Sequence, residues 1–206
     1  MKNPTGTWDA RYDTETYVFG KAPADFLRDQ SDLLKQNAGK SALAVADGEG
    51  RNSVFMAQNG LQVTAMDSSE IGLAKARKLA DESGVKVDFK AADLRAWDWQ
   101  ENTFDLVVAI FIQFADPAFR AEIFKGMIKT VKPGGLILLH GYTPKQVEYG
   151  TGGPPNPALM YTEDMLRSAF EETEILRLEA FEKEIDEGPG HSGLSALIDL
   201  VARKPA

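Results

Sequence analysis

Acidic residues follow three successive apolar stretches of this sequence, and a glycine-rich turn accompanies the first of them. Asp47 opens the turn Asp47-Gly48-Glu49-Gly50, Asp67 ends the second stretch, and Asp93 follows the third. A carboxylate at the end of a strand can accept hydrogen bonds from the ribose hydroxyls of a nucleoside. Glycines have no Cβ and let the backbone approach a ligand closely. The pattern therefore indicates a nucleoside site at the carboxyl ends of neighbouring strands.

Other interpretations of the glycine turn stay open at this point. Such turns, and acids at strand ends, also occur in α/β proteins that bind no ligand. A nicotinamide dinucleotide would need the pattern G-x-G-x-x-G, but Ser53 stands where the third glycine belongs. Glu49 would also repel a pyrophosphate. S-adenosylmethionine carries no phosphate and has a cationic sulfonium, so the charges favour this second kind of nucleoside cofactor.

The elements that must position these residues alternate between strand and helix. After a helix over 22–36, apolar runs predict strands at about 43–46, 63–66, 104–111 and 136–140. At about 85–89 apolar residues alternate with charged ones, which predicts a strand near a sheet edge. The helices between the strands should begin at Arg51, after Ser68 or Ser69, and at Asp116-Pro117, and a last helix should begin after Thr162. This alternation predicts a parallel sheet with helices on both faces. Two longer strands, at about 175–185 and 193–202, have no helix between them and should pair as an antiparallel hairpin. The predicted fold class is α/β, with a Rossmann-like, doubly wound, mostly parallel seven-stranded sheet and a C-terminal antiparallel hairpin.

We expect a single domain over residues 1–206, because no interdomain linker, repeat or low-complexity tract interrupts the pattern. Its parts are an N-terminal arm and helix (1–40), a cofactor-binding core (41–141), an acceptor-side loop (142–161), and a C-terminal helix and hairpin (162–206). A charge run on one predicted helix, formed by Lys75, Arg77 and Lys78, is interpreted as a solvated face.

The composition narrows the classes of function. There are 31 acids against 23 lysines and arginines, a formal net charge of −8. A general nucleic-acid binder needs a basic face, so no nucleic-acid partner is expected. No apolar run approaches the roughly 20 residues that span a bilayer, and the start lacks an apolar signal-peptide core. We therefore expect a cytoplasmic monomer or homodimer without a membrane partner. The sequence has no cysteine, which excludes a thiolate nucleophile, and we expect no metal site.

Taken together, these motifs resemble class I S-adenosylmethionine-dependent methyltransferases, and within them the tellurite-resistance and thiopurine methyltransferase-like family. The segments that carry the resemblance are 42–52 (ALAVADGEGRN), 63–67 (VTAMD), 92–94 (ADL), 104–109 (FDLVVA) and 132–135 (KPGG). The Gly-Arg-Asn step at 50–52, the loop at 149–154 and the segment 191–196 favour the tellurite-resistance subgroup. The resemblance covers about residues 8–203, almost the whole chain.

The resemblance implies a set of cofactor-binding residues around the strand ends. They are Asp47, Gly48, Glu49, Gly50, Asn52, Asp67, Ser68, Asp93, Leu94, Ala109 and Ile110. In this set Asp67 would bind the ribose hydroxyls, Asp93 would accept from the adenine amino group, and backbone at Ala109 and Ile110 would hold the amino-acid end. The family usually has an acid and a further glycine where this chain has Ala44 and Ala46. We therefore expect the cofactor's ammonium group to lie against Asp47 or backbone carbonyls.

The sequence carries fewer signals for the methyl-acceptor site than for the cofactor site. Methyl transfer needs a general base only when the acceptor carries a proton that must leave. The candidate acceptor-site residues are His191, Tyr149, Gln113 and Arg51. Two of them also have a structural interpretation: Arg51 as a partner of a neighbouring acid, and Tyr149 as a packing residue. His140, at the end of the fifth strand, is interpreted first as a partner for nearby backbone. Trp8, Tyr12 and Phe19 would either cover the cofactor or pack as an arm.

The predicted function is the transfer of a methyl group from S-adenosylmethionine to a small-molecule acceptor. By resemblance that acceptor is a chalcogen oxyanion, such as tellurite or selenite, or a thiol or selenol compound. Two alternatives remain at this stage: a nucleoside-binding regulatory protein without turnover, and an NAD-dependent oxidoreductase of the same fold.

Overall fold

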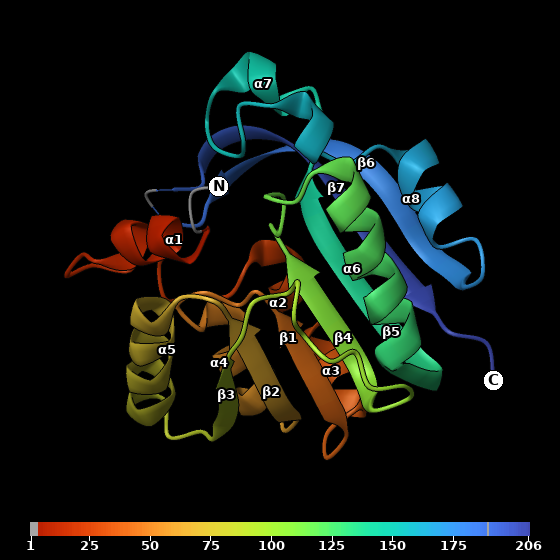
Figure 1. The fold of residues 1–206 in the computed structure, drawn as a ribbon, viewed down its shortest axis with the longest axis horizontal. Coiled ribbons are helices and arrows are strands. Elements are labelled where there is room, and N and C mark those ends of the chain that lie inside the picture. The colour runs from red at the N-terminus through yellow and green to blue at the C-terminus, as the bar shows by residue number, and fades with distance from the viewer. Residues whose placement is uncertain (1–3, 189) are drawn as a thin grey trace. The chain divides into compact units, whose positions relative to one another are not determined.

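A computed structural model of the chain describes residues 4–188 and 190–206 (Figure 1). The chain divides into two compact units, which are described separately. The first comprises Met1–Trp97 with Glu187–Gly190, and the second comprises Asp98–Asp186 with His191–Ala206. The single domain expected over the whole chain stays a prediction.

The first unit contains three parallel strands in the order β3-β2-β1. They are β1 (Ser41–Val45), β2 (Gln62–Asp67) and β3 (Val87–Ala91). The middle of the apolar strand β1 is buried, whereas β3 alternates between half-buried and exposed residues. This contrast was predicted from the charged residues between Val85 and Phe89, which suit a strand near a sheet edge.

Two crossover helices of this unit begin as their sequences predict. Helix α4 (Arg51–Gln58) starts after Gly50, and α5 (Glu70–Glu82) is capped by Ser69, whose Oγ accepts from Gly72 N at 3.0 Å. Helix α4 packs against β2 and α5 against β3, and the two helices also contact each other. The N-terminal arm begins with helix α1 (Pro4–Tyr12).

The single helix predicted over 22–36 is wrong. The structure has two short helices, α2 (Asp25–Asp29) and α3 (Ser31–Gln36), with Gln30 between them at φ −91° and ψ 13°. The Ser31 hydroxyl donates to the Arg28 carbonyl. A side-chain hydroxyl that takes a backbone acceptor in this way competes with the helical hydrogen-bond pattern.

The second unit contains four strands in the order β4-β5-β7-β6. They are β4 (Phe104–Ile110), β5 (Val131–Tyr142), β6 (Glu174–Asp186) and β7 (Ser192–Arg203). Strands β4 and β5 are parallel, and β7 pairs antiparallel with both β5 and β6. Helix α6 (Pro117–Thr130) connects the parallel pair and begins as predicted at Asp116, which accepts from Phe119 N at 2.9 Å.

Two predictions for the second unit need correction. The fifth strand begins at Val131 rather than at Leu136, because the Pro-Gly-Gly segment 133–135 is part of the strand. The pairing of this strand with β4 is irregular there, with a register shift between Phe104 and Leu106 of β4. The predicted acceptor-side loop over 142–161 contains helix α7 (Gln146–Tyr149) and a 3-10 turn (Pro157–Leu159). Helix α8 (Glu163–Ala169) then follows its predicted cap.

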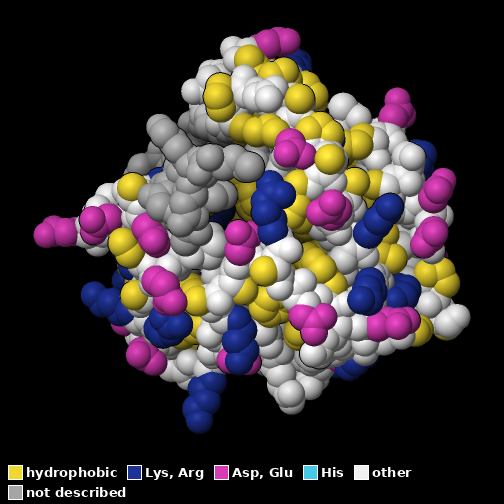
Figure 2. All heavy atoms as spheres, viewed as in Figure 1, with side chains coloured by type: hydrophobic (Ala, Val, Ile, Leu, Met, Phe, Trp, Pro, Cys, Tyr) yellow, Lys and Arg dark blue, Asp and Glu magenta, His cyan; other side chains and the backbone are white. Residues whose placement is uncertain are grey.

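The seven strands and their directions confirm the predicted fold class. Across residues 4–188 and 190–206, no helix is long and apolar enough to cross a membrane. Figure 2 shows acidic and basic side chains interspersed on one face of the molecule, with apolar side chains between them.

Candidate functional site

The turn after β1 has a backbone that favours glycine. Gly48 and Gly50 have φ values of 61° and 89°, in the left-handed region. A Cβ at Gly50 would lie 2.6 Å from Ala76 Cβ on α5, so packing of the turn against that helix already requires glycine there. Ala46 also has a positive φ of 49°, which is unfavourable for a residue with a Cβ by about 1 kcal/mol. Ala46 stands where the methyltransferases that this sequence resembles usually have glycine. Its backbone therefore keeps a conformation that suits glycine, although the residue is alanine.

Asp67 joins the end of β2 to the glycine turn. Its Oδ2 accepts from Gly48 N at 2.9 Å and its Oδ1 accepts from Ser69 N at 2.8 Å. The residue is 6% exposed, and burial raises the pKa of its carboxyl group. Each carboxylate oxygen has a further lone pair that can accept a hydrogen bond from a ligand hydroxyl.

Asp47 is tied to the helix that follows the turn. Its Oδ1 accepts from Ser53 N at 3.2 Å, and the Ser53 hydroxyl donates to its Oδ2. The pKa of Asp47 is raised to about 7, mainly by desolvation; the Asp67 carboxylate also raises it, and the Ser53 hydrogen bonds lower it. A cation placed beside this carboxyl would favour its ionised form.

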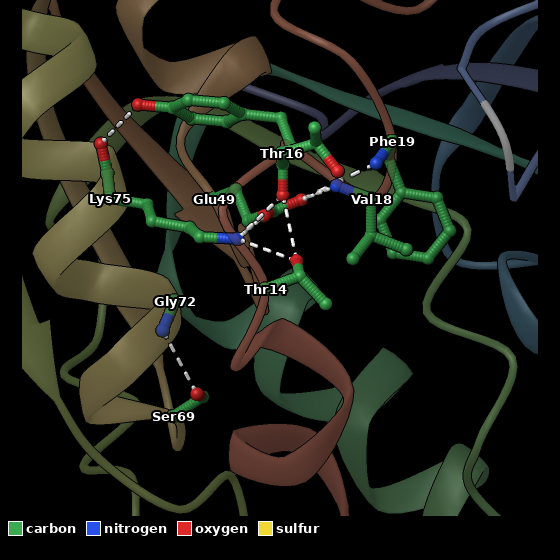
Figure 3. Close-up of polar contacts among 9 residues, drawn as sticks. Thr14, Thr16, Val18, Phe19, Glu49, Ser69, Gly72 and Lys75 are labelled. Carbon is green, nitrogen blue, oxygen red and sulfur yellow. Dashed lines mark hydrogen bonds and ion pairs between the residues drawn. The ribbon is translucent and has the colours of Figure 1, made fainter.

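Three neighbouring side chains of the turn hold other parts of the first unit. Glu49 Oε2 accepts from Val18 N at 2.8 Å (Figure 3), and Asn52 Oδ1 accepts from Ala24 N at 3.0 Å. Arg51 has its own partner in the hairpin turn. The side chains of Glu49 and Asn52 therefore anchor the N-terminal residues.

Arg51 forms a buried ion pair with Glu187, which is 136 residues further along the chain. Arg51 Nη2 lies 2.8 Å from Glu187 Oε2, and the two side chains are 7% and 3% exposed. Asp25 N donates to the other carboxylate oxygen at 2.9 Å. The pairing with an acid was the structural interpretation of Arg51, but the acid is remote in sequence.

The remaining candidates of the first unit follow β2 and β3. Ser68 is half-buried, Asp93 is exposed, and Leu94 is buried. Asp93 Oδ1 accepts from Arg95 N at 2.9 Å, which fixes one carboxylate oxygen near the backbone. These residues follow the carboxyl ends of parallel strands, the edge at which α/β sheets bind ligands.

Aromatic and imidazole rings gather at the carboxyl ends of β4 and β5 in the second unit. Phe111 follows the buried strand residues Ala109 and Ile110 and has a positive φ of 55°. Its ring centroid lies 4.2 Å from that of His191 and 4.7 Å from those of His140 and Tyr142. We call Phe111, His140, Tyr142 and His191 the strand-end cluster.

The structure gives His140 a buried carboxylate partner that the sequence interpretation did not name. Its Nδ1 lies 2.6 Å from Asp199 Oδ1, and Asp199 Oδ2 lies 2.9 Å from Arg177 Nη2. His140 and Asp199 are both 2% exposed. The carboxylate thus fixes the orientation of the imidazole next to Phe111.

The other acceptor-site candidates of the second unit have different settings. Gln113 Nε2 donates to Tyr142 O at 2.8 Å and its Oε1 accepts from Tyr142 N at 2.7 Å, so its amide is bound to backbone. Tyr149 lies on α7, where its hydroxyl donates to Glu182, and Lys145 Nζ is 2.5 Å from the same carboxylate. Of these candidates, His191 lies in the strand-end cluster.

One sequence prediction at the candidate site is wrong, and Phe111, Asp199 and Glu187 were missed. Lys75 was assigned to a solvated face, but its side chain is 14% exposed and pairs with Glu49 at 2.8 Å. Asp199 could have been found, because it is the charged residue in the apolar run 196–201. Glu187 has no such signal in its sequence neighbourhood. Among the described residues, no group of three or more histidines, aspartates or glutamates is arranged to hold a metal ion.

The first unit fits a nucleoside with a positive charge. Buried Asp67 and the nearby Asp47 place two carboxyl groups at one short turn, whereas the charge of Glu49 is balanced by Lys75 at 2.8 Å. Such a turn would repel a pyrophosphate and would attract a sulfonium or ammonium group. The acids of this turn therefore suit S-adenosylmethionine better than a dinucleotide.

Comparison with known proteins agrees with this geometry. Residues 42–135 match the family described as a methyltransferase domain. This part of the chain is similar to methyltransferase domains. The ubiquinone biosynthesis O-methyltransferase of Idiomarina loihiensis is 38% identical over 113 residues, which are 54% of this chain and 45% of that protein. The chain thus spans about half the length of the curated relatives it matches.

Solved structures extend the likeness of the methyltransferase fold over the whole chain. N-methyltransferase NodS from Bradyrhizobium japonicum, in complex with S-adenosyl-l-homocysteine, has a TM-score of 0.73 at 14% identity and covers 100% of both chains. TehB from Haemophilus influenzae has a TM-score of 0.69 at 20% identity and covers 97% of this chain and 66% of that one. The family match agrees with the predicted resemblance, and the solved structures agree with the predicted fold.

Proposed function

We propose that this chain transfers a methyl group from S-adenosylmethionine to a small-molecule acceptor. When bound, S-adenosylmethionine supplies an electrophilic methyl group, whose bond to sulfur breaks as the bond to the acceptor forms. The observation that carries the proposal is the buried Asp67 carboxylate at the end of β2, bonded to the glycine turn within the matched residues 42–135.

The proposal gives the chain's residues distinct tasks toward the cofactor. Asp67 would accept from the ribose hydroxyls, and Asp93 with the Leu94 amide would recognise adenine. Asp47 is our candidate for the ammonium group, since it lies at the same turn with a raised pKa. Backbone at 109–110 would hold the amino-acid end. These are binding and orienting tasks, which can supply most of the acceleration of a displacement reaction.

On the acceptor side, we propose that His191 contacts the substrate beside Phe111. An imidazole can take the proton of a thiol or selenol, or donate to an oxyanion. We keep chalcogen oxyanions and thiol or selenol compounds as the proposed acceptors. The relatives named as O-methyltransferases make an oxygen acceptor a necessary arm of the test. A cytoplasmic monomer or homodimer without nucleic-acid or membrane partners remains part of the proposal.

Cofactor binding is tested by titration. The wild-type protein should be stabilised against thermal unfolding by S-adenosylmethionine and S-adenosyl-l-homocysteine, and not by NAD. Asp67→Asn should weaken binding of S-adenosyl-l-homocysteine at least tenfold, because two hydroxyl-to-carboxylate bonds lose their charge. The matched control is Asp88→Asn, since Asp88 is an exposed residue of β3 that pairs with Lys90. Stabilisation by NAD alone would end the methyltransferase proposal.

The acceptor is tested with a panel of tellurite, selenite, alkyl and aryl thiols, and catechols, followed by mass spectrometry and headspace analysis. Methylated product from a thiol or an oxyanion supports the proposed acceptor class, whereas product from catechols alone contradicts it. His191→Gln should lower turnover with a protonated thiol more than with a fully ionised one. Equal losses on both would remove the base role from His191.

A further inference from the structure

Two charged side chains hold residues 14–19, which we call the clasp segment (Figure 3). Glu49 Oε2 accepts from Val18 N at 2.8 Å and from Phe19 N at 3.3 Å. Glu49 Oε1 pairs with Lys75 Nζ at 2.8 Å, and the two side chains are 2% and 14% exposed. Glu49 therefore binds the clasp segment from the glycine turn.

Lys75 binds the same segment from helix α5. Its ammonium group donates to Thr14 Oγ1 at 3.1 Å and to Thr16 O at 2.8 Å, besides Glu49. These partners use all three of its N–H donors. The Tyr17 hydroxyl in turn donates to Lys75 O at 2.9 Å. The ammonium group is thus fully engaged in joining the turn, α5 and the clasp segment.

The helix before the clasp segment covers the turn itself. A Cβ added to Gly48 would lie 2.5 Å from Tyr12 Oη, and one added to Gly72 would lie 3.0 Å from Tyr12 Cδ2. Asp9 Oδ1 accepts from Ser69 Oγ at 2.5 Å, so α1 is also fixed at the start of α5. The Arg11 guanidinium lies 5.0 Å from the centre of the Phe19 ring, which links α1 to the clasp segment. Access to Gly48 therefore depends on the position of these residues.

We propose that Glu49 and Lys75 are positioning residues that couple closure of the clasp segment to occupation of the glycine turn by S-adenosylmethionine. The proposal rests on the proposed function. Glu49 stands between the two glycines of the turn, so closing the clasp segment fixes the same backbone that would face the cofactor. Closure also excludes water from the acidic turn, which strengthens its attraction for a cationic ligand. Coupling is reciprocal: a ligand held more tightly in the closed state favours closure by the same factor.

The test compares Lys75→Met with Lys78→Met, a matched change on the same helix at a side chain that is 72% exposed. Calorimetry measures the affinity for S-adenosyl-l-homocysteine, and mass spectrometry follows trypsin cleavage after Arg11 and Lys21, which are both exposed. Circular dichroism checks that each variant is folded. Glu49→Gln, which keeps one acceptor oxygen and removes the charge, is the second variant.

In the wild type and in Lys78→Met, saturating S-adenosyl-l-homocysteine should slow cleavage after Lys21 about tenfold. Lys75→Met and Glu49→Gln should bind it about tenfold more weakly and lose most of this protection. If the folded Lys75→Met variant bound S-adenosyl-l-homocysteine as tightly as the wild type and kept its protection from trypsin, this inference would be overturned while the proposed function would stand. Faster cleavage of the wild type on ligand binding would also overturn it, because the ligand would then open the clasp segment. Failure of the wild type to bind the ligand at all would overturn the proposed function and this inference together.

Discussion

Replacing Asp47 with asparagine should change how the stability of the protein depends on pH. The Asp47 carboxyl has a pKa raised from its ordinary 3.8 to about 7, mainly by desolvation. Between these two values the folded state keeps a proton that the unfolded state has released. The free energy of unfolding therefore falls as the pH rises through this window, and the contribution present below about pH 4 is lost above about pH 7.

The size of the effect follows from the shift. A difference of about three pKa units at about 1.4 kcal/mol each gives a ceiling of about 4 kcal/mol above pH 7. Most of it, about 3 kcal/mol, develops between pH 5 and pH 8. Asparagine cannot ionise, and its carbonyl oxygen can still accept from Ser53 N, a bond of 3.2 Å in the wild type. The variant should therefore be the more stable protein at pH 8.

Urea denaturation at pH 5, 6, 7 and 8 measures this dependence for the wild type and for Asp47→Asn. The exposed Asp81→Asn, on α5, controls for the loss of one negative charge. The expected result is a gap between Asp47→Asn and wild type that widens with pH, while Asp81→Asn follows the wild type. Parallel curves for all three proteins would refute the assignment of a raised pKa to Asp47.

Three further substitutions test the buried polar groups and the strained turn. Arg51→Met should destabilise the protein by about 3–5 kcal/mol in urea, because it leaves a buried carboxylate without its cation; a loss below about 1 kcal/mol would contradict a buried pair. Ala46→Gly should be neutral or stabilising by up to about 1 kcal/mol, whereas Ala44→Gly within β1 should cost about 1 kcal/mol; equal losses would show no strain at Ala46. Asp199→Ala should lower the free energy of unfolding by about 2–4 kcal/mol. It should also shift the imidazole nitrogen signals of His140 in NMR spectra, which are simple to assign because the sequence has two histidines. Unchanged signals would contradict the contact.

Much of the fold could be predicted because local signals agreed with the tertiary arrangement. Asp116 before Pro117 and Ser69 before Glu70 marked helix starts that the structure confirms. The position of β3 followed from its alternating pattern. Gln30 is different: nothing in the local pattern showed that Ser31 would bond back to a carbonyl and divide the helix.

The position of the glycine turn could be predicted from the sequence, but the partners of its side chains could not. Glycines and strand-end acids identified the turn, since their conformational and charge requirements are local. The partners of Glu49 and Lys75 depend on how the arm returns to the turn, which no helical or strand period encodes. Phe111 escaped notice for a similar reason, because its positive φ leaves no trace in hydrophobic periodicity. Contacts that span long stretches of sequence account for most of what was missed.

The ion pair between Arg51 and Glu187 also determines when the first unit can complete its folding during synthesis. Its two residues are 136 positions apart. At about 5–20 residues per second, a ribosome needs roughly 7–27 s between them. During that interval Arg51 lacks the Glu187 carboxylate, its partner in the folded protein. The first unit also lacks the segment Glu187–Gly190, which belongs to it. A nascent chain should therefore gain protease resistance at the turn only after residue 187 has left the exit tunnel, however early β1 and β2 have paired.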